Sequence, residues 1–229
     1  VSVLLNINRR NTNVVLGEQY RKLYGSGWIE DTLCGLRFRL SAGSFYQVNR
    51  EGAELLYETA ARMAVVRGGE SLWDLYCGAG TIGLSMLSPG RNARPAQVTG
   101  VEIVPEAVAC AERNARLNAE AGRIPPDAAH FFCADAGDAA ALFAAADTGA
   151  APAPDIVIID PPRKGTTPEL IRELARRGIP RVVYVSCDPE TLARDCALFR
   201  ASGYAVGEVQ PVDMFPRTGH VETVCLLSK

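Results

Sequence analysis

The stretch Ser71-Leu-Trp-Asp-Leu-Tyr-Cys-Gly-Ala-Gly-Thr-Ile-Gly-Leu84 decides the fold of this chain. Residues 71–76 are apolar enough to form a buried strand, and residues 81–87 have the pattern of a helix. Gly78 and Gly80 lie between them, where the missing side chains let the backbone turn tightly and approach a ligand closely. The stretch therefore predicts a strand, a glycine turn and a helix, an arrangement that builds ligand sites in α/β folds.

Downstream of this turn, short apolar strands alternate with helical stretches to the end of the chain. This alternation predicts one mostly parallel sheet with helices on both faces. The last two strands follow each other without a helix, so we expect these two strands to pair antiparallel at one edge of the sheet. The expected strands are 71–76, 97–102, 130–135, 155–160, 181–187, 204–212 and 220–228, and the expected helices are 81–87, 105–121, 138–146, 168–177 and 189–202.

The N-terminal part has a different pattern. Short β-like runs at 1–8, 13–17, 28–29 and 36–40 are separated by Asn and Gly turns. We interpret them as a small β element that packs on the main domain. Asn49 has the side chain of a helix N-cap and predicts a helix that reaches about residue 66. The predicted division is a β-rich segment over 1–48 and an α/β domain over 49–229.

Bulk composition excludes several classes of protein. Of 229 residues, 48% are hydrophobic, and no apolar run reaches the roughly 18 residues of a membrane-spanning helix. We therefore expect a cytoplasmic protein with no membrane partner. The seven cysteines contain no CxxC pair, which predicts reduced thiols and no metal site. Residues 1–50 hold seven Lys/Arg against three Asp/Glu, and the remainder holds 17 against 23. A basic segment on an acidic body can contact phosphate, although a solvated surface gives the same pattern.

Acidic residues occur near the ends of three successive predicted strands. Asp74 precedes the glycine turn, Glu102 ends the second strand and Asp135 ends the third. The carboxyl ends of parallel strands meet at one edge of a sheet, where such folds bind ligands. Glu102 can accept both hydroxyls of a ribose there, and Asp135 stands where an adenine amino group would lie. A dinucleotide site is an alternative because the turn has GxGxxG spacing, and each acid alone can be a turn or capping residue.

Two later motifs indicate the chemistry. Asp160-Pro-Pro-Arg-Lys-Gly165 follows the fourth predicted strand. Amine methyltransferases carry a similar Asp-Pro-Pro followed by an aromatic residue, so Arg163 argues against amine methylation. Asp160 can instead bond a pyrimidine edge, with Arg163 and Lys164 near phosphate or a developing oxyanion. Ser186-Cys-Asp-Pro189 ends the fifth strand before a helix, whose N-terminal field is expected to favour a thiolate.

A thiolate in this position suits methyl transfer to carbon 5 of uracil. Adding the Cys187 thiolate to carbon 6 makes carbon 5 enolate-like, so that carbon 5 can attack a methylsulfonium. A base must then remove the carbon-5 proton, and Glu222 stands at the start of the last predicted strand. Taken alone, Cys187 is compatible with a structural thiol and Glu222 with a surface acid. His220 is a candidate to orient Glu222.

These motifs together resemble the uracil-5 methyltransferases of 23S ribosomal RNA and transfer RNA. The resemblance implies a Rossmann-like class I methyltransferase domain that uses S-adenosylmethionine, with Cys187 as nucleophile and Glu222 as proton acceptor. Asp160 belongs with these catalytic residues. The matching stretches are Asn6–Asn13, Leu16–Gly17, Ser44–Asn49, Asp74–Gly80, Asp160–Gly165, Ser186–Pro189 and His220–Glu222. The implied S-adenosylmethionine contacts are Gln47, Tyr76, Glu102 and Asp160, with Thr81, Asp135 and the turn residues Gly78 and Gly80.

The segment Asn6–Asn13 and the Asp-Pro-Pro-Arg-Lys-Gly motif are closer to the ribosomal RNA branch. We therefore expect a monomeric enzyme that acts on 23S ribosomal RNA, with a transfer RNA enzyme as the alternative. Family members usually carry an RNA-binding β-barrel before the matching segment, and many carry a cysteine-ligated iron–sulfur cluster there. We expect an iron–sulfur cluster only in a preceding part of the protein, and weak RNA binding by the present part.

Two other functions remain open at this point. An RNA cytosine-5 methyltransferase also uses a cysteine adduct, but such enzymes place a second cysteine where Asp160-Pro-Pro162 stands. An RNA- or nucleotide-binding module would keep the fold without catalysis. The module would be favoured if Cys187 and Glu222 lay far apart or on opposite faces.

Overall fold

A computed structural model describes residues 1–9, 15–17, 19–149 and 151–229. The described residues form eleven strands and six helices. No helix in these ranges is both long enough and apolar enough to cross a membrane. The helices are α1 (Arg50–Ala64), α2 (Thr81–Met86), α3 (Pro105–Glu120), α4 (Ala139–Asp147), α5 (Pro168–Arg176) and α6 (Pro189–Ala201).

Seven of the described strands form one sheet in the order β10-β11-β9-β8-β5-β6-β7. The five strands from β9 to β7 in this order pair in parallel. β11 instead pairs antiparallel with both β9 and β10. The predicted sheet, mostly parallel with an antiparallel last strand, is confirmed. The strands are β5 (Ser71–Leu75), β6 (Gln97–Glu102), β7 (Ala129–Cys133), β8 (Ile156–Ile159), β9 (Arg181–Ser186), β10 (Ala205–Val212) and β11 (Glu222–Ser228).

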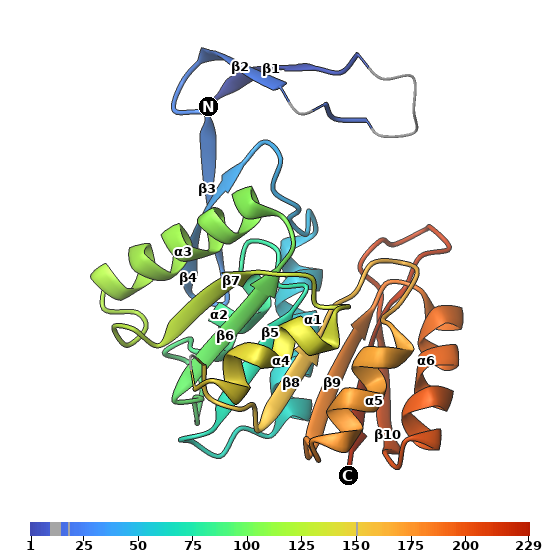
Figure 1. Ribbon diagram of the computed structural model, residues 1–229. Coiled ribbons are helices and arrows are strands. Elements are labelled where there is room, and N and C mark those ends of the chain that lie inside the picture. The colour runs from blue at the N-terminus through green and yellow to red at the C-terminus, as the bar shows by residue number, and fades with distance from the viewer. Residues whose placement is uncertain (10–14, 18, 150) are drawn as a thin grey trace.

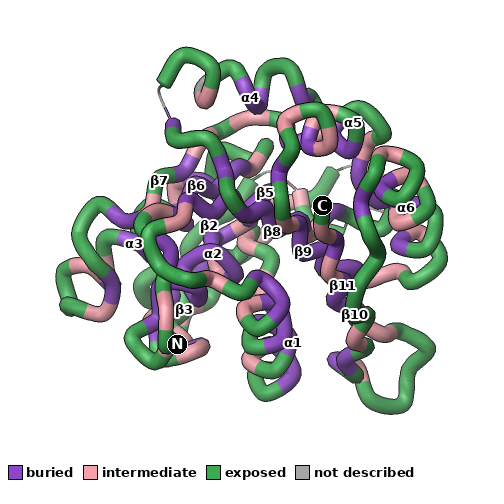
Figure 2. The backbone as a smooth tube through the Cα atoms, turned by 90° about the horizontal axis from the view of Figure 1, so that it is seen from below, coloured by how far each residue is buried: buried purple, intermediate pink, exposed green. Residues whose placement is uncertain are grey.

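Helices cover both faces of the sheet, as the alternation predicts. In Figure 2, α4, α5 and α6 lie on one side of the row of strands, and α1, α2 and α3 lie on the other. A separate buried cluster fills each interface. Leu72 and Ile158 belong to the first cluster, whereas Trp73 and Val157 belong to the second. Successive strand residues point to opposite faces, which is why these strands are apolar throughout.

Capping side chains explain where the helices begin. The Asn49 Oδ1 accepts a hydrogen bond from the Gly52 amide over 3.1 Å at the start of α1, so the predicted N-cap is confirmed. Asp138, Thr167 and Asp188 cap α4, α5 and α6 in the same way. Proline follows the cap in α5 and α6, where no amide donor is needed.

The N-terminal part forms two hairpins. β1 (Val3–Ile7) pairs antiparallel with β2 (Gln19–Tyr24), and this ribbon stands away from the sheet (Figure 1). β3 (Trp28–Leu33) pairs with β4 (Leu36–Ser41). The inner side chains of the second hairpin, including Phe38, join the main core. The two hairpins therefore differ: one contributes to the core and the other does not.

The sequence patterns did not predict β2. All six of its residues are exposed, so no apolar alternation identifies them. A β-like run was expected at 13–17 instead. Residues 13 and 14 lie outside the described part, and residues 15–17 are not in a strand. This prediction is wrong for the residues that the structure describes.

Candidate active site

The predicted site residues gather where the parallel strands end. β6 and β7 lie on one side of β5 in the sheet, and the next strands along the chain, β8 and β9, lie on its other side. Such a switch point opens a ligand crevice at the carboxyl ends of the strands. The glycine turn follows β5, Asp160 follows β8 and Cys187 follows β9. Because β11 is antiparallel, it begins at this same end with Glu222.

The turn after β5 is formed by left-handed backbone. Tyr76, Gly78 and Gly80 have φ angles of 65°, 53° and 78°. The two glycines adopt such angles without strain. A side chain at position 80 would press against the Phe131 ring at 3.0 Å, whereas one at position 78 would meet nothing within 4 Å. The backbone at Gly78 is therefore the open part of the turn.

Glu102 joins the turn to the loop that follows β6. Its Oε2 accepts the Gly78 amide over 3.1 Å, and its Oε1 accepts the Val104 amide over 2.9 Å. The side chain is half-buried at the end of β6. Each carboxylate oxygen has a further lone pair, so Glu102 can hold the turn and still accept the hydroxyls expected from the sequence.

Asp74 lies beneath the turn and has one oxygen without a partner. It is fully buried in β5, and its Oδ2 accepts the Gly83 amide over 2.7 Å. Its Oδ1 has no hydrogen-bond partner among the described residues. Burial, opposed by the bond from the Gly83 amide and assisted by the nearby Glu102, raises the pKa of Asp74 to about 7. From the sequence, Asp74 is predicted as the acid before the turn but not as a site residue; an acid inside the apolar run Trp73–Leu75 was the available signal.

Asp135 lies beyond the strand in which it was predicted. β7 ends at Cys133, because the next residues turn toward α4. The exposed Asp135 carboxylate accepts the Gly137 amide over 2.8 Å. It also contributes, after burial, to the raised pKa of Tyr76. Asp135 therefore lies near Tyr76 of the glycine turn, but in a turn of its own rather than at a strand end.

Tyr76, Thr81 and Gln47 are three further predicted cofactor contacts, and they lie in different surroundings. The Tyr76 hydroxyl hydrogen-bonds the Thr166 hydroxyl over 3.2 Å, which joins the glycine turn to the loop after β8. Thr81 begins α2 and hydrogen-bonds the Tyr57 hydroxyl of α1 over 2.9 Å. Gln47 is buried in the loop before α1.

Strand pairing brings Cys187 and Glu222 together. β9 and β11 are antiparallel, with Ser186 opposite Thr223. Extending this register by one residue puts Cys187 opposite Glu222, and opposite residues project to the same face. Glu222 is 5% exposed, whereas Cys187 is half-buried. The arrangement does not favour a binding module with the two residues far apart.

Asp160 and Arg163 complete this cluster. Burial raises the pKa of Asp160 well above its usual range, and Glu222 and Asp74 add to the effect. Burial also raises the pKa of Glu222, while Arg163 opposes this shift. Burial thus favours the protonated form of both carboxyls, and the positive charge of Arg163 opposes this effect at Glu222.

The prediction that the position before α6 favours the thiolate form of Cys187 disagrees with the structure. Burial raises the pKa of the Cys187 thiol, and Glu222 and Asp160 raise it further. Arg163 lowers it. The position before α6 was expected to favour the thiolate, but desolvation and two carboxyls outweigh it. The charge of Arg163 therefore favours ionisation of Cys187 against these effects.

Two further expectations concern His220 and Lys164. The His220 Nδ1 lies 3.3 Å from the Arg163 Nη2, so the observed contact of the ring is with the arginine rather than with Glu222. Lys164 is exposed, and its carbonyl oxygen accepts a hydrogen bond from Arg194. Within the described ranges, no group of three His, Cys, Asp or Glu residues is placed to hold a metal ion.

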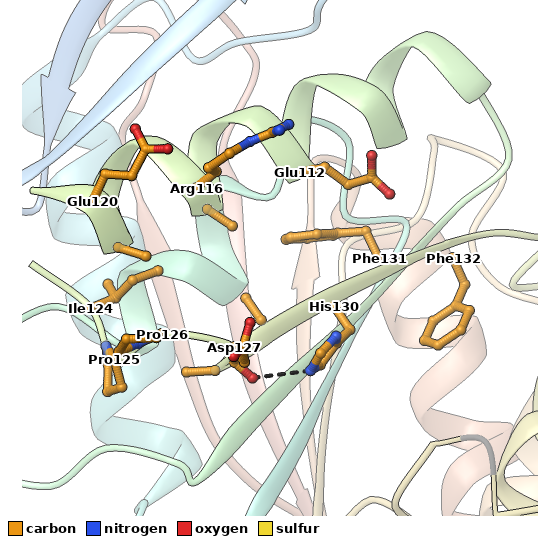
Figure 3. Close-up of a pocket in the computed structure, with 14 residues that line it drawn as sticks. Glu112, Arg116, Glu120, Ile124, Pro125, Pro126, Asp127, His130, Phe131 and Phe132 are labelled. Carbon is orange, nitrogen blue, oxygen red and sulfur yellow. Dashed lines mark hydrogen bonds between the residues drawn. The ribbon is translucent and has the colours of Figure 1, made fainter.

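A hollow of about 500 Å³ lies away from this cluster, between α3 and β7 (Figure 3). Its lining includes Glu112, Arg116 and His130, and the His130 ring bonds the Asp127 carbonyl oxygen over 3.0 Å. None of the predicted site residues lines it. The hollow is thus separate from the edge of the sheet where the chemistry is expected.

Comparisons with known proteins agree with this arrangement. A model of the tRNA (uracil-5-)-methyltransferase family matches residues 28–229. RNA methyltransferases from Enterococcus faecalis and Halalkalibacterium halodurans, both described as uncharacterized, are 43% and 42% identical over 100% and 99% of the chain. The chain spans 47% and 46% of these relatives, about half of each.

A solved structure is also similar over nearly the whole chain. It is the Pyrococcus abyssi tRNA (uracil-54, C5)-methyltransferase in complex with S-adenosyl-L-homocysteine. It is 30% identical, with a TM-score of 0.74, and the match covers 99% of this chain and 50% of that one. The family model and the relatives cover both the glycine turn and the Cys187–Glu222 pair. The chain therefore belongs to the tRNA (uracil-5-)-methyltransferase family.

Proposed function

We propose that this chain is the catalytic part of an S-adenosylmethionine-dependent RNA methyltransferase that methylates carbon 5 of a uridine. The observation that carries the proposal is the register of β9 and β11: Ser186 lies opposite Thr223, and extending this pairing by one residue puts Cys187 opposite Glu222. Methylation of uracil carbon 5 through a covalent adduct needs a nucleophile for carbon 6 and a base for the carbon-5 proton in one site, whereas a binding module needs neither.

The cofactor half of the site fits S-adenosylmethionine, which supplies an electrophilic, positively charged methyl donor when bound. The unpaired Asp74 Oδ1 under the turn supports this fit, because buried acceptors are normally satisfied. The complex of the Pyrococcus abyssi enzyme with S-adenosyl-L-homocysteine supports it as well. We assign the cofactor contacts to Gln47, Tyr76, Gly78, Gly80, Thr81, Glu102, Asp135 and Asp160.

Cys187 acts first in the proposed reaction. Its thiolate forms a bond to carbon 6 of the uracil, and the electron pair of the 5,6 double bond moves toward carbon 5 and the carbonyl at carbon 4. Carbon 5 then forms the new bond to the methyl group as the methyl–sulfur bond of the donor breaks, which leaves a neutral thioether. Arg163 favours the thiolate, and we assign Asp160 to bond the pyrimidine edge.

Glu222 completes the reaction. It takes the proton from carbon 5, the double bond re-forms and the Cys187 sulfur leaves carbon 6. Burial raises the pKa of the Glu222 carboxyl, and a carboxylate with a raised pKa is a stronger base near neutral pH.

We propose 23S ribosomal RNA as the substrate, because residues 6–13 and 160–165 resemble the ribosomal RNA branch. Transfer RNA is the second candidate. The description of the matching family and the Pyrococcus abyssi enzyme, which acts on uracil-54 of transfer RNA, favour it.

The test uses the full-length protein with labelled S-adenosylmethionine and either 23S ribosomal RNA or transfer RNA that lacks 5-methyluridine. The RNA is digested and its nucleosides are separated. We expect label in 5-methyluridine from ribosomal RNA. Label in 5-methyluridine from transfer RNA alone would support the proposed reaction but identify transfer RNA as the substrate. Label in 5-methylcytidine, or in neither RNA, would refute the proposed reaction.

We also propose that the protein acts as a cytoplasmic monomer and that its units divide near residue 48. Its seven cysteines are free thiols, as expected in a reducing compartment. Sedimentation of the full-length protein tests the monomer.

A further inference from the structure

Helix α6 holds the loop that follows β8. The Thr191 hydroxyl donates to the Arg163 carbonyl oxygen over 3.0 Å, and the Arg194 guanidinium donates to the Lys164 carbonyl oxygen over 2.8 Å. Asp195 contacts the end of the same loop. We call Thr191, Arg194 and Asp195 the α6 clamp. Their spacing puts them on one face of the helix, directed at consecutive residues of the loop.

Asp195 is the buried centre of the clamp. It is 0% exposed, and its Oδ2 accepts the Thr166 amide over 3.0 Å and the Tyr184 hydroxyl over 2.7 Å. Its Oδ1 accepts two bonds from Arg194, at 2.9 and 2.7 Å. A buried carboxylate needs this number of donors to replace water. The loop amide is thus one of the groups that keep the charge of Asp195 satisfied.

The loop fits the clamp closely at Gly165. Its φ angle is 78°, and a Cβ there would lie 2.4 Å from both the Asp195 Oδ2 and the Arg194 Nη2. The Gly165 amide also donates to the Pro162 carbonyl oxygen over 2.7 Å. Only glycine allows this approach. The loop therefore has one close-packed position on α6.

The same loop carries Arg163 to the catalytic cluster. The Arg163 guanidinium lies 3.3 Å from His220. It lowers the pKa of Cys187, Glu222 and Asp188, although it is not the largest influence on any of them. α6 itself begins directly after Cys187, with Asp188 as its cap. One helix therefore anchors both the nucleophile and the loop that carries the cation.

We propose that Asp195 is a positioning residue: through the α6 clamp it fixes residues 163–166 and keeps the Arg163 guanidinium beside the Cys187 thiol. This inference rests on the proposed nucleophilic role of Cys187. A purely structural Asp195 would change the stability of the protein but not the ionisation of Cys187. The ionisable groups around the thiol are Asp160 after β8, Glu222 on β11, Asp188 before α6 and Arg163, with His220 against the arginine.

The test measures ionisation of Cys187 without RNA or a methyl donor. The full-length protein is alkylated with iodoacetamide between pH 6 and 10, and the modified Cys187 peptide is quantified by mass spectrometry. The midpoint of the rate profile gives the thiol pKa, whereas the plateau reports access. We expect Arg163→Gln to raise the midpoint by about 0.5 to 1 pH unit, because a nearby positive charge is lost. Alkylation at pH 7 would then be roughly 3- to 10-fold slower.

Asp195→Asn should raise the midpoint in the same direction, and the double variant should show no further rise. Asp147→Asn is the control, since it breaks the ion pair with Arg177 between α4 and α5 and should leave the midpoint unchanged. An unchanged midpoint in folded Asp195→Asn, or additive shifts in the double variant, would overturn the proposal.

Should Asp195→Asn fail to fold, Thr191→Val provides the second test. It removes only the hydroxyl that bonds the Arg163 carbonyl oxygen, and we expect a smaller rise in the midpoint. No rise in a protein with parental thermal stability would again overturn the proposal. Because the assay needs no methyl transfer, its failure is distinct from failure of the proposed function.

Discussion

The two halves of the candidate site are built in different ways. The cofactor half uses a local glycine turn and backbone amides, and Glu102 accepts the Gly78 and Val104 amides there. The catalytic half joins side chains from separate strands, with Cys187 and Glu222 set by the register of β9 and β11. The first half depends on backbone shape and the second on side-chain charge. A substitution in one half should therefore leave the other half largely intact.

The largest expected effect separates the two halves directly. Cys187→Ala should lower methyl transfer by at least about 10³-fold, because no other group replaces a lost nucleophile. Its affinity for S-adenosylmethionine, measured by calorimetry, should stay within about twofold, well under the 1.4 kcal/mol of a tenfold change. The exposed Cys133 on β7 gives the matched control Cys133→Ala, which should change neither quantity. Loss of cofactor binding in folded Cys187→Ala would show that the halves are not separate.

Asp74 gives the next largest effect, on stability. Its pKa rises from 3.8 to about 7 on folding. Between these two pH values, the carboxyl is therefore protonated in the folded chain and ionised in the unfolded chain. Its stabilising contribution is complete below about pH 4 and is lost as the pH rises through 7. At about 1.4 kcal/mol per pKa unit, the loss is up to about 4 kcal/mol.

Asp74→Asn removes this titration while leaving an oxygen to accept the Gly83 amide. The difference in unfolding free energy between the variant and the parent should therefore shift in favour of the variant between pH 4 and pH 8. Urea unfolding at both pH values measures it. An equal difference at the two pH values would mean that the pKa of Asp74 is not raised by its burial.

Glu102 gives a smaller effect, confined to the cofactor half. Glu102→Ala should weaken S-adenosylmethionine binding by about 1.5–3 kcal/mol, the usual value of a charge-assisted hydrogen bond. Glu106→Ala changes an exposed acid in the first turn of α3 and should have no effect. Calorimetry on both variants compares them. Unchanged affinity in a folded Glu102→Ala protein would remove Glu102 from the site.

The cofactor half was also the more predictable from sequence. Its turn is local, so the positions of the glycines, Asp74 and Glu102 near the ends of strands could be predicted from the sequence alone. The thiol environment could not be predicted, because the pKa of Cys187 depends first on its burial in the folded chain and then on Glu222 and Asp160, which come near it only after strand pairing. The wrong prediction of a thiolate field has this origin. β2 was missed for another reason: all its residues are exposed, so no burial pattern marks it.

The role of the α6 clamp was likewise absent from the sequence patterns. Asp195 lies within the helix Pro189–Ala201. No motif in its local sequence indicates that its carboxylate accepts a hydrogen bond from the Thr166 amide. The fold class, by contrast, follows from strand–helix alternation, which requires no knowledge of side-chain contacts. Long-range polar contacts are therefore the part that needs the structure.

The most direct test of the central claim is a trapping experiment with Glu222→Gln in the full-length protein. The variant keeps the thiol and the methyl donor but lacks the base that removes the carbon-5 proton. It should accumulate a methylated, covalent protein–RNA complex that survives denaturing electrophoresis. Cys187→Ala should form no complex, and Asp213→Asn, a change of an exposed acid on the preceding loop, should turn over normally. Normal turnover by Glu222→Gln, or methylation of uridine by Cys187→Ala, would contradict the account.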